Sequence, residues 1–392
     1  ITKTVVAVEV MRLRDEGVVA LSDRVSRFFP DAVFGDVTVA QLLSHTAGIA
    51  AELPGSWWER SPGVDASGLW GALDASVVKH VAGRRHHYSN VGYAVLGALV
   101  ERLRGGDWFS VVREEVLEPL GMSRTSLTPV APCARGFAVH PFADVVVPEP
   151  SQETGAMGPA GQLWSTVADL ARWAAFLGGA TNGVLSVDSL AEMTETVTVA
   201  EGPKWVSGHG LGWQLRGSGG RRLVGHGGSM PGFQAGLWVD RSSGDGVVMV
   251  MNATTPSQPW SLSDALLSIM DECEPVMPSP WRPRESVPAD ELGLAGYWFW
   301  GTSAGLLRVE GDGWLRLDAV SGMMSTSRFR PVGSDEWVGL DGYYAGETLR
   351  VVRGDDGRVR HVDLGTFVLT RSPYDPDGFV PGGWSEGTWP VR

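Results

Sequence analysis

The sequence predicts an α+β domain followed by a small all-β domain. Three observations predict this fold class. Helix-spaced apolar segments dominate up to about residue 205, short β-branched or aromatic runs separated by glycine turns follow, and almost everything beyond residue 290 has strand character. Between these parts, residues 276–290 are rich in proline, as a linker would be. We therefore expect a first domain over 1–275, a linker over 276–290, and a small antiparallel sandwich or barrel over 291–392.

Helices are expected where apolar spacing meets a terminal signal. The first places Val5, Val8 and Leu13 near one face and has Gly17 as its C-cap. Ser89 or Asn90 stands near the start of another. The predicted helical segments of the first domain are 4–16, the start of 37–50, 89–104, 165–177 (capped by Ser165 or Thr166) and 261–274.

Strands are expected over three runs near the end of the first domain, 221–228, 233–240 and 244–253. In the second domain, Asp312-Gly313 and Asp356-Gly357 each lie between alternating runs, which predicts two hairpins. Residues 366–371 supply a further strand. The tail, 372–392, has little periodicity.

Composition excludes several classes of function. A net charge of −13 argues against nucleic acid as a partner, because phosphate binding needs clustered Lys and Arg. No run is long and apolar enough to span a bilayer. Cys133 and Cys273 lie far apart without a CxxC pattern, so we expect neither a metal site nor a disulfide framework. Two free buried thiols are expected, with a single disulfide as the alternative. No signal peptide is visible, which favours the cytoplasm, although an incomplete N-terminus leaves secretion open.

Four short stretches could carry chemistry. They are Lys3, one of three lysines in the chain, then LLSHTAGI at Leu42–Ile49, Tyr88-Ser89-Asn90, and VGHGGSMPGF at Val224–Phe233. Each has a simple structural explanation when it is taken alone: a solvated charge, a loop, a helix cap or a turn beside a strand. Their order along the chain is the informative feature.

In that order the stretches resemble the serine β-lactamase and penicillin-binding-protein family, in particular its class C, esterase and D-aminopeptidase branch. The resemblance covers residues 1 to about 275 and implies an antiparallel sheet flanked by helices. It matches Lys3 to the lysine of a Ser-x-x-Lys motif, Tyr88-Ser89-Asn90 to a Tyr-x-Asn triplet, and His226-Gly227-Gly228 to a His-x-Gly or Lys-Thr-Gly triplet on a strand. It implies no cofactor.

The resemblance also implies roles for these residues. A serine nucleophile needs a base, and Lys3 could serve if burial kept it neutral, with Tyr88 relaying the proton; which of the two is the base stays open. Asn90 would orient Lys3 and bind the substrate amide or ester. Gly228 would allow close approach to the strand, and the Ser229 amide would be one oxyanion donor. His226 replaces a lysine, and an imidazole binds carboxylates less firmly than an ammonium does.

The nucleophile itself would be the residue before Ile1. We therefore expect that the chain is the downstream part of a longer protein, that it is nearly inactive alone, and that it exposes a sheet edge where further strands belong. SVVK at Ser76–Lys79 fits Ser-x-x-Lys literally but lies only nine residues before Tyr88, so a surface helix explains it better. No His-Glu-x-x-His motif is present.

The expected function is a serine hydrolase that acts on esters, amides or peptides through an acyl-enzyme. A non-catalytic binding homologue and a transacylase or peptide cyclase are the alternatives. The partner is a small-molecule or peptide substrate, and no oligomeric state is predicted. His45 is expected to hydrogen-bond a loop rather than act in catalysis. Trp164, Trp173 and Trp213 could line an acyl pocket or simply pack in the core.

Overall fold

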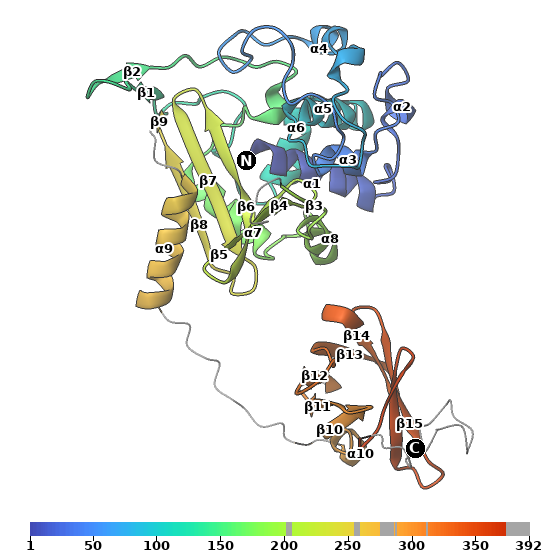
Figure 1. Ribbon diagram of the computed structural model, residues 1–392. Helices are drawn as coiled ribbons and strands as arrows, with labels where there is room; N and C mark the ends of the chain where they lie inside the picture. The colour runs from blue at the N-terminus through green and yellow to red at the C-terminus, as the bar shows by residue number, and fades with distance from the viewer. Residues whose placement is uncertain (201–205, 255–258, 275–285, 287, 311–312, 374–392) are drawn as a thin grey trace. The chain divides into compact units, whose positions relative to one another are not determined.

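The computed structural model describes residues 1–200, 206–254, 259–274, 286, 288–310 and 313–373. The chain divides into two compact units, Ile1–Met277 and Pro278–Arg392 (Figure 1). Most of the expected linker, 276–290, and nearly all of the tail, 372–392, lie outside the described residues.

Most helices of the first unit lie on one side of its sheet, around a helix that begins at the start of the chain, while α9 covers the other side (Figure 1). Helix α1 was expected to have one apolar face, but from Thr2 to Met11 its side chains are buried all round, including Thr2, Lys3 and Glu9. A helix buried on every side belongs to the interior of a domain, so α1 is the central helix of this unit. The helices are α1 (Thr2–Asp15), α2 (Val25–Phe28), α3 (Val39–Leu43), α4 (Ala66–Ala72), α5 (Asn90–Arg104), α6 (Trp108–Val112), α7 (Val167–Leu177), α8 (Val187–Met193) and α9 (Pro259–Cys273).

The sheet of the first unit is antiparallel, with six strands in the order β3-β4-β5-β6-β7-β8. Alternate side chains of a strand point to opposite faces. Leu237 and Val239 of β7 therefore join the main core, while Trp238 packs with Leu267 of α9 on the other face. The strands are β3 (Thr198–Val199), β4 (Ser207–His209), β5 (Gln214–Ser218), β6 (Arg221–Met230), β7 (Phe233–Asp240) and β8 (Gly246–Met251).

Strand β8 is an edge strand of this sheet. Its Val250 is 46% exposed. That further strands belong at an edge of this sheet stays a prediction. Just beyond it, β9 (Ala253–Thr254) pairs in parallel with β1 (Phe137–Val139), which forms a hairpin with β2 (Val146–Pro148).

The second unit is an antiparallel barrel. Its eight strands pair in chain order, and the ends of the sheet meet where Phe299 and Thr370 exchange backbone hydrogen bonds of 2.8 and 2.9 Å. Buried Trp298, Phe329 and Trp337 lie in its core. Both predicted hairpins are present, as β11–β12 and β15–β16. The elements are α10 (Ala289–Leu292), β10 (Gly296–Trp300), β11 (Ser303–Val309), β12 (Leu315–Ala319), β13 (Ser327–Gly333), β14 (Glu336–Gly339), β15 (Thr348–Arg353), β16 (Val359–Leu364) and β17 (Phe367–Leu369).

The two cysteines are free, as expected, but both are exposed rather than buried. Cys133 follows the cis peptide Ala131-Pro132 in a connecting segment, and Cys273 is the last residue of α9. Neither belongs to the inward face of a strand or helix, which is where a cysteine would be buried. The prediction of buried thiols was wrong for this reason.

Candidate active site

The N-terminal turn of α1 carries Lys3 into the interior, where its side chain is 4% exposed. Its Nζ donates a hydrogen bond to the carbonyl oxygen of Ala160, in the 3₁₀ turn η3 (Gly158–Ala160). The same nitrogen lies 5.1 Å from the centre of the Tyr88 ring and 5.7 Å from that of Tyr93. The side chain of Lys3 is therefore held in one position by a carbonyl and two aromatic faces.

A glycine on α5 explains how the Ala160 carbonyl comes to face α1. A Cβ at Gly97 would lie 2.1 Å from Cγ of Pro159, far inside contact distance. Only glycine therefore lets the 3₁₀ turn pack directly on α5. Trp58 packs beside this turn: a Cβ at Gly161, the residue that follows the turn, would lie 3.5 Å from the Trp58 ring.

Burial lowers the pKa of Lys3 from its ordinary 10.5 to about 7, because the charged ammonium loses its water; nearby Glu52 and Glu59 oppose this shift. Burial likewise raises the pKa of Tyr88, and the two glutamates add to that effect. Near pH 7 a substantial share of the Lys3 amine is therefore neutral, while the Tyr88 phenol keeps its proton.

His45 contacts the Tyr88-Ser89-Asn90 segment and holds it in place. Its Nδ1 accepts a hydrogen bond of 3.0 Å from the Ser89 amide, and its ring stacks on Tyr88 with the ring centres 4.2 Å apart. Its own carbonyl accepts a 2.7 Å hydrogen bond from the His87 amide. His45 has a φ of 58°, which is uncommon outside glycine and indicates a position determined by its neighbours. The structural role expected for His45 is confirmed.

Asn90 is held by a carboxylate. Its Nδ2 donates a 2.6 Å hydrogen bond to Oε1 of Glu52, and Oε2 of Glu52 accepts a 2.7 Å bond from the Trp58 indole. The predicted action of Asn90 on Lys3 stays a prediction. Glu52 was not among the predicted site residues, because an acid between a glycine-rich loop and a tryptophan gives no signal of its own.

Strand β6 brings the predicted triplet His226-Gly227-Gly228 alongside the start of α1. The backbone nitrogen of Ile1 lies 3.3 Å from the Gly227 carbonyl oxygen, and a Cβ at Gly228 would lie 3.8 Å from that nitrogen. His226 is buried, and this burial is the main reason that its pKa is lowered well below its usual value. Its Nδ1 bonds to the Gly227 carbonyl, which can only accept, so the neutral ring keeps Nε2 as an acceptor.

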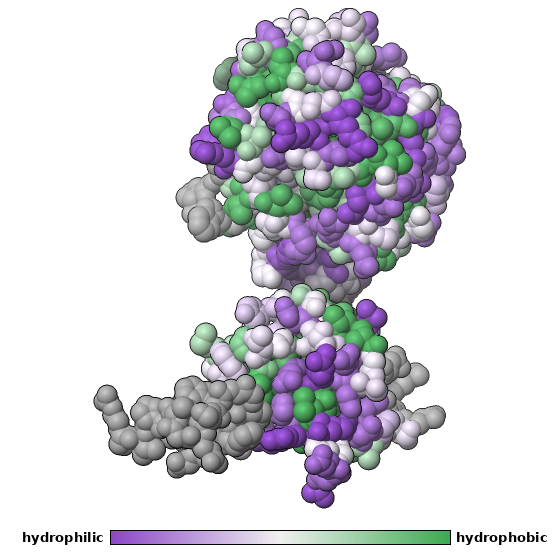
Figure 2. Space-filling model, turned by 90° about the vertical axis from the view of Figure 1, so that its right-hand side faces the viewer, coloured by the Kyte–Doolittle hydropathy of each residue, from purple (hydrophilic) through white to green (hydrophobic). Residues whose placement is uncertain are grey.

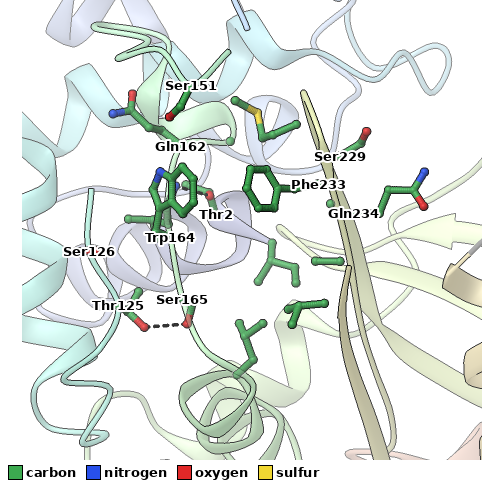
Figure 3. A pocket seen from close by; sticks show the side chains of 18 of the residues that line it. Thr2, Thr125, Ser126, Ser151, Gln162, Trp164, Ser165, Ser229, Phe233 and Gln234 are labelled. Carbon is green, nitrogen blue, oxygen red and sulfur yellow. Dashed lines mark hydrogen bonds between the residues drawn. The ribbon is translucent and has the colours of Figure 1, made fainter. Parts of the chain in front are cut away.

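All six predicted site residues line one cavity of about 650 Å³: Lys3, Tyr88, Asn90, His226, Gly228 and Ser229. Trp164 and Phe233 also line it, with their rings 5.0 Å apart and nearly perpendicular (Figure 3). A hydrogen bond of 2.8 Å joins Thr125 and Ser165 in another part of the wall. The cavity is therefore lined by aromatic and polar groups and is large enough for a small organic molecule.

The structure also shows which of the other singled-out residues line the cavity. Ser76 and Lys79 are exposed and lie outside the cavity, as expected of a surface segment. Trp173 is fully buried, although the cavity reaches it, and its indole donates to Thr4. Trp213 is a core residue that does not line the cavity. Of the three tryptophans, Trp164 is thus the one that faces the cavity.

The next observations concern membrane-spanning helices, metal-ligating groups and surface hydropathy. In the part of the chain that the structure describes, no helix has the length and apolar character to cross a membrane, and no group of metal-ligating side chains is assembled. Figure 2 shows hydrophilic and hydrophobic residues interspersed over one face of the first unit.

Family models match both units. The model described as "Beta-lactamase" matches residues 1–267, more than half of the chain. A second model, described as a domain of unknown function, DUF7586, matches residues 287–371.

Individual proteins give the same result for the first unit. "Putative beta-lactamase-like 1" of Homo sapiens is 30% identical over 209 residues, which are 53% of this chain and 41% of that protein. "Penicillin-binding protein 4" of Amycolatopsis lactamdurans is 29% identical over 318 residues, 76% of this chain and 82% of its own. This chain thus spans less than half the length of the human relative.

A solved structure of similar fold is the D-stereospecific amidohydrolase from Streptomyces sp., with a TM-score of 0.60 and 24% identity, covering 70% of this chain and 85% of that one. At this identity the likeness concerns the fold. Together with the family model over residues 1–267, it shows that this chain belongs to the β-lactamase family, whose fold is followed here by an all-β barrel.

Proposed function

We propose that this protein is a serine hydrolase that cleaves esters or amides through a covalent acyl-enzyme. The observation that carries the proposal is the buried Lys3, whose pKa of about 7 leaves much of it neutral at physiological pH, beside Tyr88 and the glycine strand. A neutral amine can accept the proton of a hydroxyl group, whereas an ammonium cannot.

The nucleophile in this proposal is a serine that precedes Ile1. Support comes from the Ile1 nitrogen, which lies against Gly227 and Gly228 of β6, at the wall of the cavity. Residues three apart on a helix share a face, so a serine one position before Ile1 would project on the same side as Lys3.

In the first step, the serine oxygen attacks the substrate carbonyl carbon while its proton passes to Lys3. The amides of the serine and of Ser229 stabilise the oxyanion. The bond from carbon to the leaving group then breaks, and Tyr88 relays the proton from Lys3 to that group. Water attacks the acyl-enzyme next and gives its proton to the same pair. The bond from the carbonyl carbon to the serine oxygen then breaks, and the pair returns the proton to that oxygen, which releases the acid and restores the serine.

The proposed substrates carry no essential carboxylate at the β6 side, because His226 is a neutral acceptor there. Amide hydrolysis also agrees with the Streptomyces neighbour, described as a D-stereospecific amidohydrolase.

The test uses the full-length natural protein with a fluorophosphonate probe. We expect time-dependent labelling that disappears when the residue before Ile1 is replaced by alanine. Replacing the exposed Ser76 by alanine is the matched control and is expected to leave labelling unchanged. Absence of labelling in a folded protein, or labelling that survives the first substitution, contradicts the proposal.

A further inference from the structure

Strand β6 extends beyond its neighbour β5 toward the cavity. The two strands pair only up to Gln214, which lies opposite Gly225, whereas β6 pairs with β7 as far as Met230. Strand β5 begins at Gln214 because a tight turn precedes it, closed by a 2.9 Å hydrogen bond from the Gly210 amide to the Trp213 carbonyl. Among the described strands, the end of β6 therefore has a neighbour on one side only.

Helix α1 fills the space that a longer β5 would need. Gly212, in the turn before β5, has a φ of 89°, and a Cβ at this position would lie 2.3 Å from the Cβ of Ala7. The start of α1 also lies against the end of β6, where the Ile1 nitrogen contacts the Gly227 carbonyl oxygen. Strand β5 cannot continue alongside β6 without displacing α1, so this edge of β6 stays open toward the cavity.

The hydrogen bonds of Gly227 show which backbone groups face the open edge. Its carbonyl oxygen receives the Ile1 nitrogen, and its amide donates a 3.0 Å hydrogen bond to Oε1 of Gln214. In an extended strand, the N–H and C=O of one residue point to the same edge, and residues two apart repeat that direction. The amide of Ser229 therefore points to the same edge as the amide of Gly227, and Ser229 lines the cavity.

The side chain of Gln214 replaces a missing strand at one hydrogen bond. It fixes the peptide at Gly227, where two successive glycines provide little steric restraint of their own. A tilt of this peptide would change the direction of the Ser229 amide two residues later. Gln214 does not line the cavity, so it acts on β6 and not on the substrate.

We propose that Gln214 is a positioning residue for the oxyanion hole: by accepting the Gly227 amide, it keeps the Ser229 amide directed at the carbonyl oxygen of the substrate. This inference rests on the proposed hydrolase function and adds a residue to it. An oxyanion donor lowers the barrier because it is directed in advance at the place where negative charge develops. Losing that direction slows the reaction most when the reacting oxygen is a strong hydrogen-bond acceptor.

The experiment compares two probes on the full-length protein. One is a fluorophosphonate, and the other is its analogue in which sulfur replaces the oxygen doubly bonded to phosphorus. In both, the serine oxygen displaces fluoride, but sulfur accepts hydrogen bonds poorly. The ratio of the two labelling rate constants, oxygen probe over sulfur probe, therefore reports on the oxyanion hole, and intrinsic reactivity cancels when wild type and variant are compared.

Gln214→Met removes the acceptor while keeping a similar length. We expect this variant to lower the rate constant for the oxygen probe by about 10- to 100-fold and the ratio by about 10-fold. Gln214→Asn, which is one methylene shorter, should show the same fall and serves as a second variant if the first does not fold. Gln214→Glu, which keeps an oxygen acceptor, should retain more of the ratio than either. Ser218→Ala, at the other end of β5, is the control and should leave the ratio unchanged.

The ratio separates positioning from a merely structural role. A structural role would lower both rate constants alike in a folded variant, and an unchanged ratio therefore overturns the inference, as does an unchanged rate constant for the oxygen probe. The proposed function fails in a different way. Absence of labelling in the folded wild type rejects the hydrolase, whereas labelling with a ratio that Gln214→Met leaves unchanged rejects the role of Gln214 alone.

Discussion

Replacing Lys3 by methionine tests its environment through stability, without any activity assay. The folded protein holds the pKa of Lys3 at about 7, against an ordinary 10.5. Between these two values the unfolded chain binds one more proton than the folded chain. The free energy of unfolding of the wild type therefore rises with pH in this window, relative to a protein without this lysine.

The size of the effect follows from the shift. Each pH unit within the window is worth about 1.4 kcal/mol. From pH 7.5 to 9.5, the wild type should thus gain about 3 kcal/mol of stability relative to Lys3→Met. Methionine has a similar length and no charge, so the variant removes the titration while largely filling the space.

The assay is equilibrium urea unfolding at pH 7.5, 8.5 and 9.5, followed by circular dichroism. Taking the difference between wild type and variant cancels every other titrating group that the two proteins share. Lys79→Met, at an exposed lysine, is the matched control and should change stability by less than about 0.5 kcal/mol at each pH. A difference between wild type and Lys3→Met that does not change with pH refutes the reasoning, because Lys3 would then be solvated or charged in the folded state.

Three further substitutions test how the site is built. His45→Ala removes the acceptor of the Ser89 amide, so the free energy of unfolding measured in urea should fall by about 1–3 kcal/mol. His45→Asn should lose less, because asparagine tolerates the positive φ at this position. Equal losses in the two variants would show that the positive φ of His45 does not contribute. Gly97→Ala sets a methyl group against Pro159 and should cost about 1–3 kcal/mol while slowing fluorophosphonate labelling; a neutral effect would show that the turn is free to move. Ser76→Ala should change neither stability nor labelling, and loss of labelling would reinstate that serine as the nucleophile.

Local signals predicted much of the architecture. Ser89 and Thr166 do cap their helices, by accepting from the amides of Gly92 and Asp169, because capping depends on residues three apart. The Asp356-Gly357 hairpin also formed where expected. In each case the interacting residues are close in sequence, so the pattern alone contains the information.

Features that depend on contacts between residues far apart in the chain could not be predicted from the sequence. The chain around Lys3 gives no sign of its hydrogen-bond partner, because Ala160 lies 157 residues away. The burial of α1 on all sides depends on neighbours such as Arg104, which pairs with the fully buried Glu9. A charged residue in a helix predicts a solvated face unless its partner is known. Gln214 was missed because its partner is a backbone amide on the next strand.

The covalent intermediate is the most direct test of the account as a whole. The full-length protein would be incubated with a slowly hydrolysed ester, quenched in acid, digested and analysed by mass spectrometry. The account predicts an acyl group on a serine in the peptide that continues into Ile1-Thr2-Lys3, and its loss at neutral pH as the ester is hydrolysed. An acyl group on any other residue, or turnover that leaves no acylated peptide at any quench time, contradicts it.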